Sequence, residues 1–246
     1  MTFSILARCP RTGQFGMSIA TYTLAVGQYC DGIVPRVGIT MSQASVRQVN
    51  NGIGVGLLRS GFEPHHILRT LRENDPFAQF RQIGVIDRDG RTAVHSGPGA
   101  RDWKGHREAD GVIAMGNVLL GPQVVDGMLE AFLRCESQSL ADRLLLALEG
   151  GCRAGGQSNG SRRMPERSSA LIVFGDHDHP LLSLRVDAHD HAIHELRRIY
   201  ERYKRYKRYA DYYRQRDLRP ADTPGQEVFE KTWGGETMYT SPGEGA

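Results

Sequence analysis

Predicted strands and helices come in groups along this chain, and they do not alternate one for one. The expected order is three strands, two helices, three strands, two helices, two strands and one long helix. Period-two and continuous apolar patterns predict strands over residues 3–8, 15–21, 37–44, 82–86, 92–95, 112–115, 170–174 and 181–186. Grouped strands and paired helices favour layered α+β packing, with antiparallel sheets between helical layers.

Apolar residues spaced three and four apart predict the helices. They are expected over residues 46–59 and 64–72, around residues 124–132 and 140–148, and from about residue 190 onward. Pro64 suits the first turn of its helix, and Gly150 and Gly151 are expected to end the fourth helix. Residues 97–111 and the Gly- and Arg-rich stretch 151–167 are predicted to be loops.

The composition is that of a globular protein. A chain of 246 residues, 39% hydrophobic and 24% charged, is long enough for one large domain or two small ones. No apolar run approaches the ~20 residues that span a bilayer, and no charged start is followed by an apolar secretory segment. The four cysteines are scattered without a Cys-x-x-Cys pair. This pattern favours reduced thiols in the cytoplasm over disulfides or a zinc site.

The positive charge is concentrated in one segment. Residues 197–219 hold ten of the 31 Lys and Arg, three of the 28 Asp and Glu, and six of the nine tyrosines. A seam of residues three and four apart runs along the predicted helix: Leu196, Ile199, Tyr203, Tyr206, Ala210 and Tyr213. We favour docking on the protein itself or on a second copy in a homodimer. RNA binding and a membrane-surface helix are the weaker alternatives, so neither nucleic acid nor a membrane is an expected partner.

The segment after the basic helix is rich in Pro, Gly, Thr and Glu. Residues 220–246 are therefore expected to form an extended or partly disordered tail, with Trp233 and Tyr239 as candidate anchors. Together these observations divide the chain into a domain over 1–195, a Tyr- and Arg-rich helix over 196–219, and this tail.

Thr2 is the most notable candidate for chemistry. Removal of the initiator Met1 leaves a Thr that carries a hydroxyl nucleophile and a free α-amine. An α-amine titrates near 7.7–8.0, so a good fraction is an uncharged base at neutral pH. Thr activated by its own amine is a recognised nucleophile. The alternative is that Thr2 only opens the first strand.

Several short strings match one family in order and spacing over residues 1 to about 200. They include Thr2-Phe3-Ser4-Ile5, Ser42-Gln43-Ala44, Trp103-Lys104-Gly105-His106 and, most specifically, Gly116-Asn117-Val118-Leu119-Leu120-Gly121. In these strings the chain resembles DUF1028, a bacterial family of unknown function that is usually grouped with the N-terminal nucleophile (Ntn) hydrolases. The resemblance implies a four-layer αββα sandwich. It also implies hydrolysis of an amide C–N bond in a small molecule or short peptide by Thr2, without a metal or organic cofactor.

Four further residues become site candidates through this resemblance. Gln43 and Asn117 are neutral donors that could stabilise an oxyanion, or could cap a turn or satisfy buried backbone. Gly116 could allow a close backbone approach or belong to an ordinary turn. Arg81 could bind a substrate carboxylate with two hydrogen bonds or form a structural ion pair.

One loop departs from the family pattern. Relatives typically carry Gly-Gly-Asp-x-Arg-Gly where this chain has Gly155 and Gly156 followed by Gln157, Ser158 and Asn159. Two neutral amides thus replace a charged pair. A different substrate, or a binding protein without catalysis, remains an alternative to the amidohydrolase, and an oligomeric interaction module built around the Tyr- and Arg-rich helix is a third class.

Histidines gather near the end of the predicted domain. Five of the nine lie between His177 and His194, interspersed with Asp176, Asp178 and Asp190. Such spacing could bind a transition metal, but a solvated hairpin turn and a helix cap explain it better. We therefore expect no metal site, and we expect His65 and His66 at the surface of a helix start.

Overall fold

The computed structural model describes the backbone of residues 1–218 and the side chains of residues 1–207. The tail predicted over 220–246, with Trp233 and Tyr239, lies outside the described residues. The chain divides into one compact unit over Met1–Arg197 and a second unit from Arg198 onward. The layers described below all belong to the first unit.

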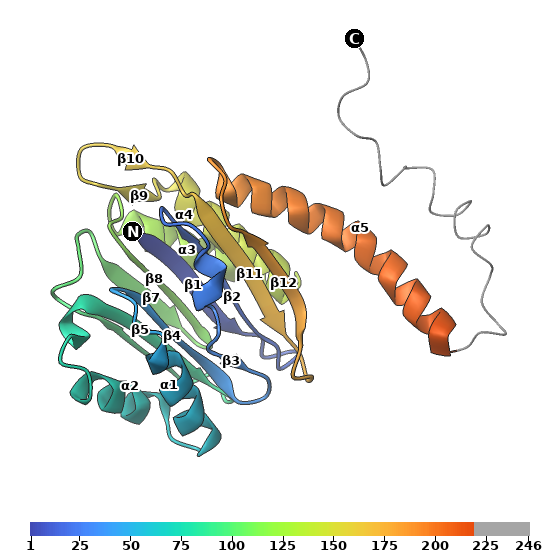
Figure 1. The fold of residues 1–246 in the computed structure, drawn as a ribbon, viewed down its shortest axis with the longest axis horizontal. Helices are drawn as coiled ribbons and strands as arrows, with labels where there is room; N and C mark the ends of the chain where they lie inside the picture. The colour runs from blue at the N-terminus through green and yellow to red at the C-terminus, as the bar shows by residue number, and fades with distance from the viewer. Residues whose placement is uncertain (219–246) are drawn as a thin grey trace, which may run out of the picture. The chain divides into compact units, whose positions relative to one another are not determined.

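Six antiparallel strands form the larger sheet (Figure 1). Its spatial order is β12 (Pro180–Val186), β11 (Ser168–Phe174), β2 (Phe15–Thr21), β1 (Thr2–Arg8), β8 (Val112–Asn117) and β7 (Gly105–Ala109). The N-terminal strand β1 is central, and Thr2 pairs with Thr21 on one side and Asn117 on the other. The first residues of the chain are therefore held between strands that come from distant parts of the sequence.

Four antiparallel strands form the smaller sheet. Its order is β3 (Ile33–Val34), β4 (Gly38–Ala44), β5 (Arg81–Asp87) and β6 (Thr92–Ser96). The hairpin between β5 and β6 turns at Gly90, which has a φ of 88°. Glycine adopts this left-handed conformation without strain, which explains the Asp-Gly sequence at this turn.

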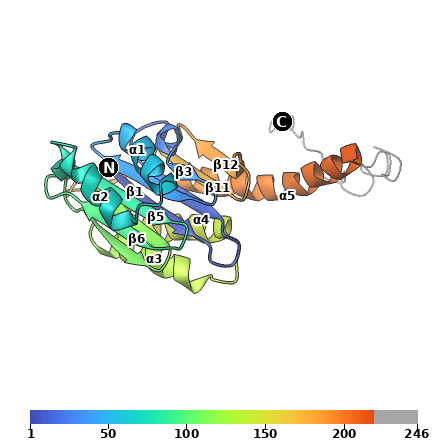
Figure 2. The ribbon, with the colours of Figure 1, turned by 90° about the horizontal axis from the view of Figure 1, so that it is seen from below.

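The two sheets lie face to face, and a helix pair covers the outer face of each. Helices α3 (Gln123–Arg134) and α4 (Leu140–Arg153) pack on the larger sheet, and α1 (Val49–Arg59) and α2 (Pro64–Glu73) pack on the smaller one. Figure 2 shows α1 and α3 on opposite sides with the strands between them. This arrangement confirms the predicted α+β class and the expectation of sheets between helical layers.

Alternate residues of each strand fill the space between the sheets. Leu6 of β1, Met17 of β2, Met41 of β4 and Ile113 of β8 belong to one buried apolar cluster. Because strand side chains alternate between the two faces, their neighbours in sequence point toward the helices. Whether a side chain points toward the other sheet or toward the helices therefore depends on whether it is in step with the buried apolar residues of its strand.

The structure corrects three sequence-based expectations. Residues 97–111 contain strand β7, and residues 151–167 contain the last turn of α4 and a hairpin of β9 (Gln157–Ser158) and β10 (Arg163–Met164). These elements are short or polar, so their apolar periodicity is weak. Gly150 and Gly151 do not end α4, which continues to Arg153. They are small because α4 packs closely here: a Cβ on Gly150 would lie 2.5 Å from the Gly127 carbonyl oxygen.

The predicted long helix is present as α5 (Ala192–Leu218). It contains residues 197–218 of the basic segment with its six tyrosines, and it crosses the boundary between the two compact units. Within the described part of the chain, no helix combines the length and apolar character needed to cross a membrane.

Candidate functional site

The layer between the sheets changes from apolar to polar at one end. In each central strand, the row of side chains that faces the other sheet ends in a polar residue. The residues of this polar end are Thr2 and Ser4 of β1, Thr21 of β2, Gln43 of β4, Gln82 of β5, Asn117 of β8 and Ser168 of β11. Six of them are buried and Thr2 is half-buried, so this is a polar site enclosed by the fold.

Thr2 lies at the edge of this site, where β1 begins. Its hydroxyl donates to the Met1 carbonyl oxygen at 2.7 Å and lies 3.2 Å from the Thr21 hydroxyl. The Thr21 hydroxyl also donates to the Met1 carbonyl and lies 3.2 Å from the Thr23 hydroxyl. The two hydroxyls of Thr2 and Thr21 therefore converge on one carbonyl oxygen, the last one before the nucleophile candidate.

The chain terminus beside Thr2 is chemically perturbed. Burial, and secondarily the positive charge of Arg101, lower the pKa of the Met1 α-amine from its usual value of 8.0. Both effects disfavour the charged form of an amine. An amine in this environment is a neutral base over a wider pH range than an exposed one.

Three side-chain amides form a buried cluster behind Thr2; we call Gln43, Gln82 and Asn117 the amide cluster. Gln43 Nε2 and Asn117 Nδ2 donate to Gln82 Oε1 at 3.0 and 2.9 Å. Gln82 Nε2 in turn donates to the Gly116 carbonyl at 2.8 Å. Ser4 joins the cluster by donating to Gln43 Oε1 at 2.7 Å. The fold thus brings the predicted Gln43 and Asn117 together, through a residue that the site prediction did not include.

Gly116 lies in strand β8 and not in a turn. It pairs with Phe3, and a Cβ at this position would lie 3.0 Å from the Thr2 carbonyl oxygen and 2.6 Å from a Leu119 methyl. A side chain here would press on the strand that carries Thr2. The close backbone approach, one of the two interpretations of Gly116, is therefore the one that matches the structure.

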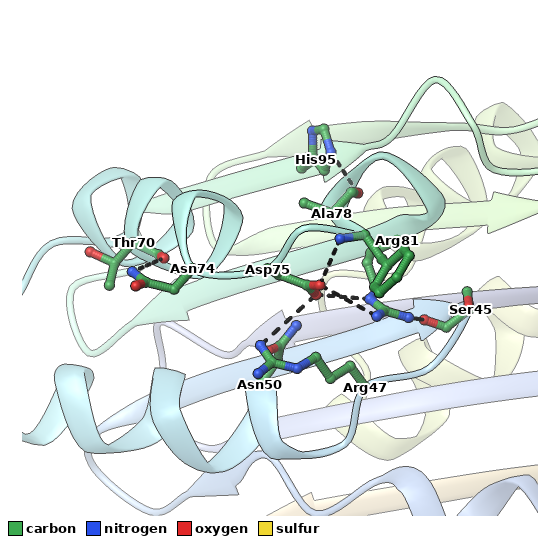
Figure 3. Close-up of polar contacts among 10 residues, drawn as sticks. Ser45, Arg47, Asn50, Thr70, Asn74, Asp75, Ala78, Arg81 and His95 are labelled. Atoms are coloured by element: carbon green, nitrogen blue, oxygen red, sulfur yellow. Dashed lines mark hydrogen bonds and ion pairs between the residues drawn. The ribbon is translucent and has the colours of Figure 1, made fainter.

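Arg81 points away from the polar end. It precedes Gln82 on β5, so its side chain projects to the opposite face of the sheet, toward the helices. Its Nε donates to Asp75 Oδ2 at 2.9 Å, and Nη1 donates to the Ser45 carbonyl (Figure 3). Arg47 Nη1 lies 3.9 Å from the same Asp75 oxygen. This geometry matches the structural ion pair that was the alternative to substrate binding.

The histidines that the sequence analysis considered as metal ligands, and His65 and His66, lie at turns and helix starts. His177 and His179 stack in the turn between β11 and β12, with ring centroids 5.3 Å apart. Among the described residues, donor atoms of Glu63, His65 and His66 lie within 4.8 Å of one another. Glu63 is already paired with Arg91 at 2.6 Å. His65 and His66 open α2, as expected.

The loop that departs from the family pattern borders the polar end. Gln157 and Ser158 are buried in the β9–β10 hairpin, and Asn159 is exposed. Asn159 Oδ1 accepts from the backbone amides of Ser161 and Arg162, at 3.2 and 3.0 Å, and so stabilises the turn. Gln157 contacts the edge of the polar end, where its Oε1 accepts from the Tyr22 amide at 2.9 Å, next to Thr21.

Sequence reasoning did not select Ser4, Thr21, Gln82 or Ser168. The pattern that could have identified them is period two: each is in step with buried apolar residues of its own strand, as Gln82 is with Ile86 and Thr21 with Met17 and Ile19. A polar residue in step with a buried apolar row must lie inside, where it needs a hydrogen-bond partner.

The comparisons define the class of protein. The family model described as "Family of unknown function (DUF1028)" matches residues 2–196. This chain belongs to that family. A search of curated proteins found no match.

One solved structure is similar to this chain. It is the crystal structure of protein SPO2555 from Silicibacter pomeroyi, itself assigned to DUF1028. The two sequences are 30% identical, and the two structures superimpose with a TM-score of 0.73. The match covers 82% of this chain and 88% of that one. The fold of the first compact unit is therefore shared with a relative solved by experiment.

Proposed function

We propose that this protein is an Ntn-type amidohydrolase that cleaves an amide C–N bond in a small molecule or short peptide. Thr2 is the nucleophile, its own α-amine is the general base, and the four layers form an αββα sandwich of the Ntn type. The observation that carries the proposal is the position of Thr2: first residue of a central strand, half-buried, and turned toward an enclosed polar site.

The reaction follows from this placement once Met1 is removed. The Thr2 hydroxyl attacks the amide carbonyl carbon, and its proton passes to the α-amine. The Thr21 hydroxyl, 3.2 Å from the Thr2 oxygen, is placed to relay this proton. The C–N bond then breaks as the amine leaves with the proton, and water hydrolyses the resulting ester of Thr2.

The amide cluster supports the geometry of this site. Gln43 and Asn117 are the donors selected from the sequence for the oxyanion, and each already donates one hydrogen bond to Gln82. Each NH₂ group has a second hydrogen that can serve a ligand. Gly116 keeps the strand of Asn117 close to Thr2, and Arg81 holds the start of β5 from its other face.

The first test is the intact mass of the untagged protein, followed by a screen of small amides and dipeptides for released amine. We expect a mass without Met1, hydrolysis by the wild type, and turnover by Thr2→Ser. Thr2→Ala is expected to be inactive, and Thr12→Ala, in an exposed turn, is the matched control. Retention of Met1, or hydrolysis by Thr2→Ala equal to the wild type, would contradict the proposal.

The pH dependence offers a second check. Burial and the positive charge of Arg101 lower the pKa of the Met1 α-amine, and we expect them to act in the same direction on the α-amine of Thr2 once Met1 is removed. Because the neutral amine is the active form, activity should rise with pH and reach half its plateau below 8.0. A midpoint above 8.0 would contradict the role of a buried amine.

A binding protein without catalysis is the second candidate. It is favoured by the two hydrogen bonds that hold the Met1 carbonyl, from Thr2 and Thr21, since these hold Met1 in place. In that case the mature chain would keep Met1 and Thr2 would have no free amine.

The domain limits and the role of α5 belong to the same proposal. We place the site in a domain over residues 1–195 and treat 196–219 as a separate basic helix. A homodimer formed through the Tyr-rich seam of this helix stays a prediction, to be checked by light scattering of the full chain and of Tyr203→Glu.

A further inference from the structure

The side chain of Gln157 lies at the end of β1 where the strand begins, and it contacts the residue that follows β2. The Thr21 carbonyl accepts from the Arg167 amide at 2.7 Å, and so points toward β11. Backbone groups of successive strand residues point to opposite sides, so the Tyr22 N–H points toward β1. Its acceptor is the side-chain Oε1 of Gln157, at 2.9 Å. The carboxamide of Gln157 therefore occupies the place where β1 would continue beyond Thr2.

The backbone around Gln157 pairs with the residues that follow β8, the strand on the other side of β1. Gln157 forms an isolated β-bridge with Leu119, two residues beyond the partner of Thr2, and the Ser158 amide donates to the Val118 carbonyl at 2.9 Å. Gln157 therefore contacts residues that follow both β2 and β8. These are the two strands that flank β1, so Gln157 lies across the end of β1. Figure 1 shows the N-terminus beside the β9–β10 hairpin, in agreement with these contacts.

The oxygen of this carboxamide accepts a hydrogen bond, but its NH₂ group donates none within the part of the chain that the structure describes. Gln157 is fully buried, and its Nε2 has no hydrogen-bond partner among the described residues. A buried donor without an acceptor is unfavourable, and such groups are rare enough to need an explanation. Gln43 and Asn117, by contrast, donate to Gln82. Gln157 is therefore a buried donor without an acceptor in the described structure, and it contacts Tyr22 and Leu119, which continue the two strands that pair with Thr2.

We propose that Gln157 Nε2 donates a hydrogen bond to the carbonyl oxygen of the acyl group that Thr2 attacks. This inference rests on the proposed function and adds a further oxyanion donor to Gln43 and Asn117. Met1 precedes Thr2 at this end of β1, and its carbonyl oxygen accepts from the Thr2 and Thr21 hydroxyls. Its removal frees the space beside Thr2 that an acyl group would use. The ligand class is a small acyl compound whose carbonyl carbon is open to attack.

A β-lactone carrying one alkyl substituent is a suitable probe because it needs no knowledge of the substrate. The Thr2 oxygen attacks the lactone carbonyl, the ring C–O bond breaks, and the proton passes through the α-amine to the new hydroxyl. The protein gains the full mass of the lactone. We expect the wild type without Met1 to be acylated at Thr2, as located by peptide mass spectrometry.

Substitutions at Gln157 separate its donor from its acceptor. Gln157→Glu keeps an oxygen for the Tyr22 N–H but loses the donor, and Gln157→Leu loses both. Loss of one oxyanion donor typically slows the reaction by about 100-fold or more, and we expect this for the acylation rate of both variants. Ser161→Ala, exposed on the same hairpin, should react at the wild-type rate. Circular dichroism and the Tm confirm that each variant is folded.

A binding experiment tests the donor without any chemistry. In the Thr2→Ala protein, acetohydroxamic acid should shift the side-chain NH₂ resonance of Gln157, which is assigned from its absence in the Gln157→Glu double variant. The NH₂ resonance of exposed Gln138 is the control and should stay in place.

Four outcomes separate the role of Gln157 from the proposed function. Acylation at Thr2 that is slowed in both Gln157 variants, together with the shift, supports both. Acylation at an unchanged rate in both variants overturns the role of Gln157 and leaves the proposed function standing. A shift without acylation of the wild type overturns the proposed function and keeps Gln157 as an acyl-oxygen site. Neither acylation nor shift overturns both.

Discussion

Gln82 lies at the centre of the hydrogen bonds at the polar end of the layer between the sheets. Its Oε1 accepts from two amides, and its Nε2 donates to the Ser96 hydroxyl at 2.8 Å and to the Gly116 carbonyl at 2.8 Å. It is completely buried. A single carboxamide thus joins β4, β5, β6 and β8 at the point where apolar packing stops.

Replacing Gln82 by Leu should be strongly destabilising. The buried amides of Gln43 and Asn117 would lose their acceptor, and each unsatisfied group costs about 1–3 kcal/mol, so we expect a loss of about 2–5 kcal/mol in the free energy of unfolding. Urea denaturation measures this. Gln138→Leu, at an exposed position, should change stability by less than about 0.5 kcal/mol. Similar effects of the two substitutions would show that the amide cluster does not stabilise the fold.

Asp75 provides a pH-dependent contribution to stability. The hydrogen bond from Arg81 is the largest of several effects that lower the pKa of Asp75 below its usual 3.8, against the opposing effect of burial. A carboxyl with a lowered pKa in the folded state contributes stability above its unfolded pKa. This contribution is lost as the pH falls below 3.8 and through the folded pKa.

Asp75→Asn should therefore destabilise the protein at neutral pH and have little effect in acid. Leaving the buried Arg81 without its partner costs about 3–5 kcal/mol at pH 7. The difference from the wild type should shrink as the pH falls below about 3.8. Urea denaturation at pH 7 and pH 3 measures it, with the exposed Asp178→Asn as control. An equal difference at both pH values would contradict the ion pair.

Helices α3 and α4 owe their close contact to glycines, whose function is not visible in one helix alone. Gly150 lies inside α4 and faces Gly127 of α3, where a Cβ on Gly150 would lie only 2.5 Å from the Gly127 carbonyl oxygen. From the sequence of one helix alone, paired glycines predict the end of that helix. The packing of two helices is what makes them part of a helix interior.

Two Gly→Ala substitutions in helices should have opposite effects. Gly150→Ala places a methyl group against α3, and overpacking of this kind costs about 1–3 kcal/mol, more than the gain in helix propensity. Gly52→Ala in α1 meets nothing within 4 Å and should stabilise by about 0.5–1 kcal/mol. Thermal and urea unfolding measure both. Equal signs for the two variants would contradict the packing argument.

The whole first unit is held together by the apolar layer between its sheets. Ile39 of the smaller sheet and Leu6 of the larger one are fully buried in the same cluster. The sheets approach closely enough that a Cβ on Gly84 would lie 2.9 Å from a Leu6 methyl. Neither sheet can keep this layer dry without the other, so we expect them to unfold together.

Ile39→Ala should weaken both sheets although it lies in only one. Truncation of a buried Ile costs about 2–5 kcal/mol. Amide hydrogen exchange should show the same loss of protection in β2 of the larger sheet as in β5 of the smaller one. Leu133→Ala, half-exposed on α3, is the control and should cost far less. Loss of protection confined to the smaller sheet would contradict a shared core.

The sequence by itself determined the elements with strong periodicity and the α+β class, because backbone period and burial are local properties. It also selected Thr2 as a site candidate from its position after Met1, and Gln43 and Asn117 through a family resemblance. Only the tertiary structure decided which of them meet. Gln82 and Thr21 join the candidate site, and Arg81 turns to the opposite face, because strand pairing and sheet packing join segments distant in sequence. The short strands β7, β9 and β10 and the role of Gly150 depend on the same long-range contacts, which leave little periodic trace in the chain.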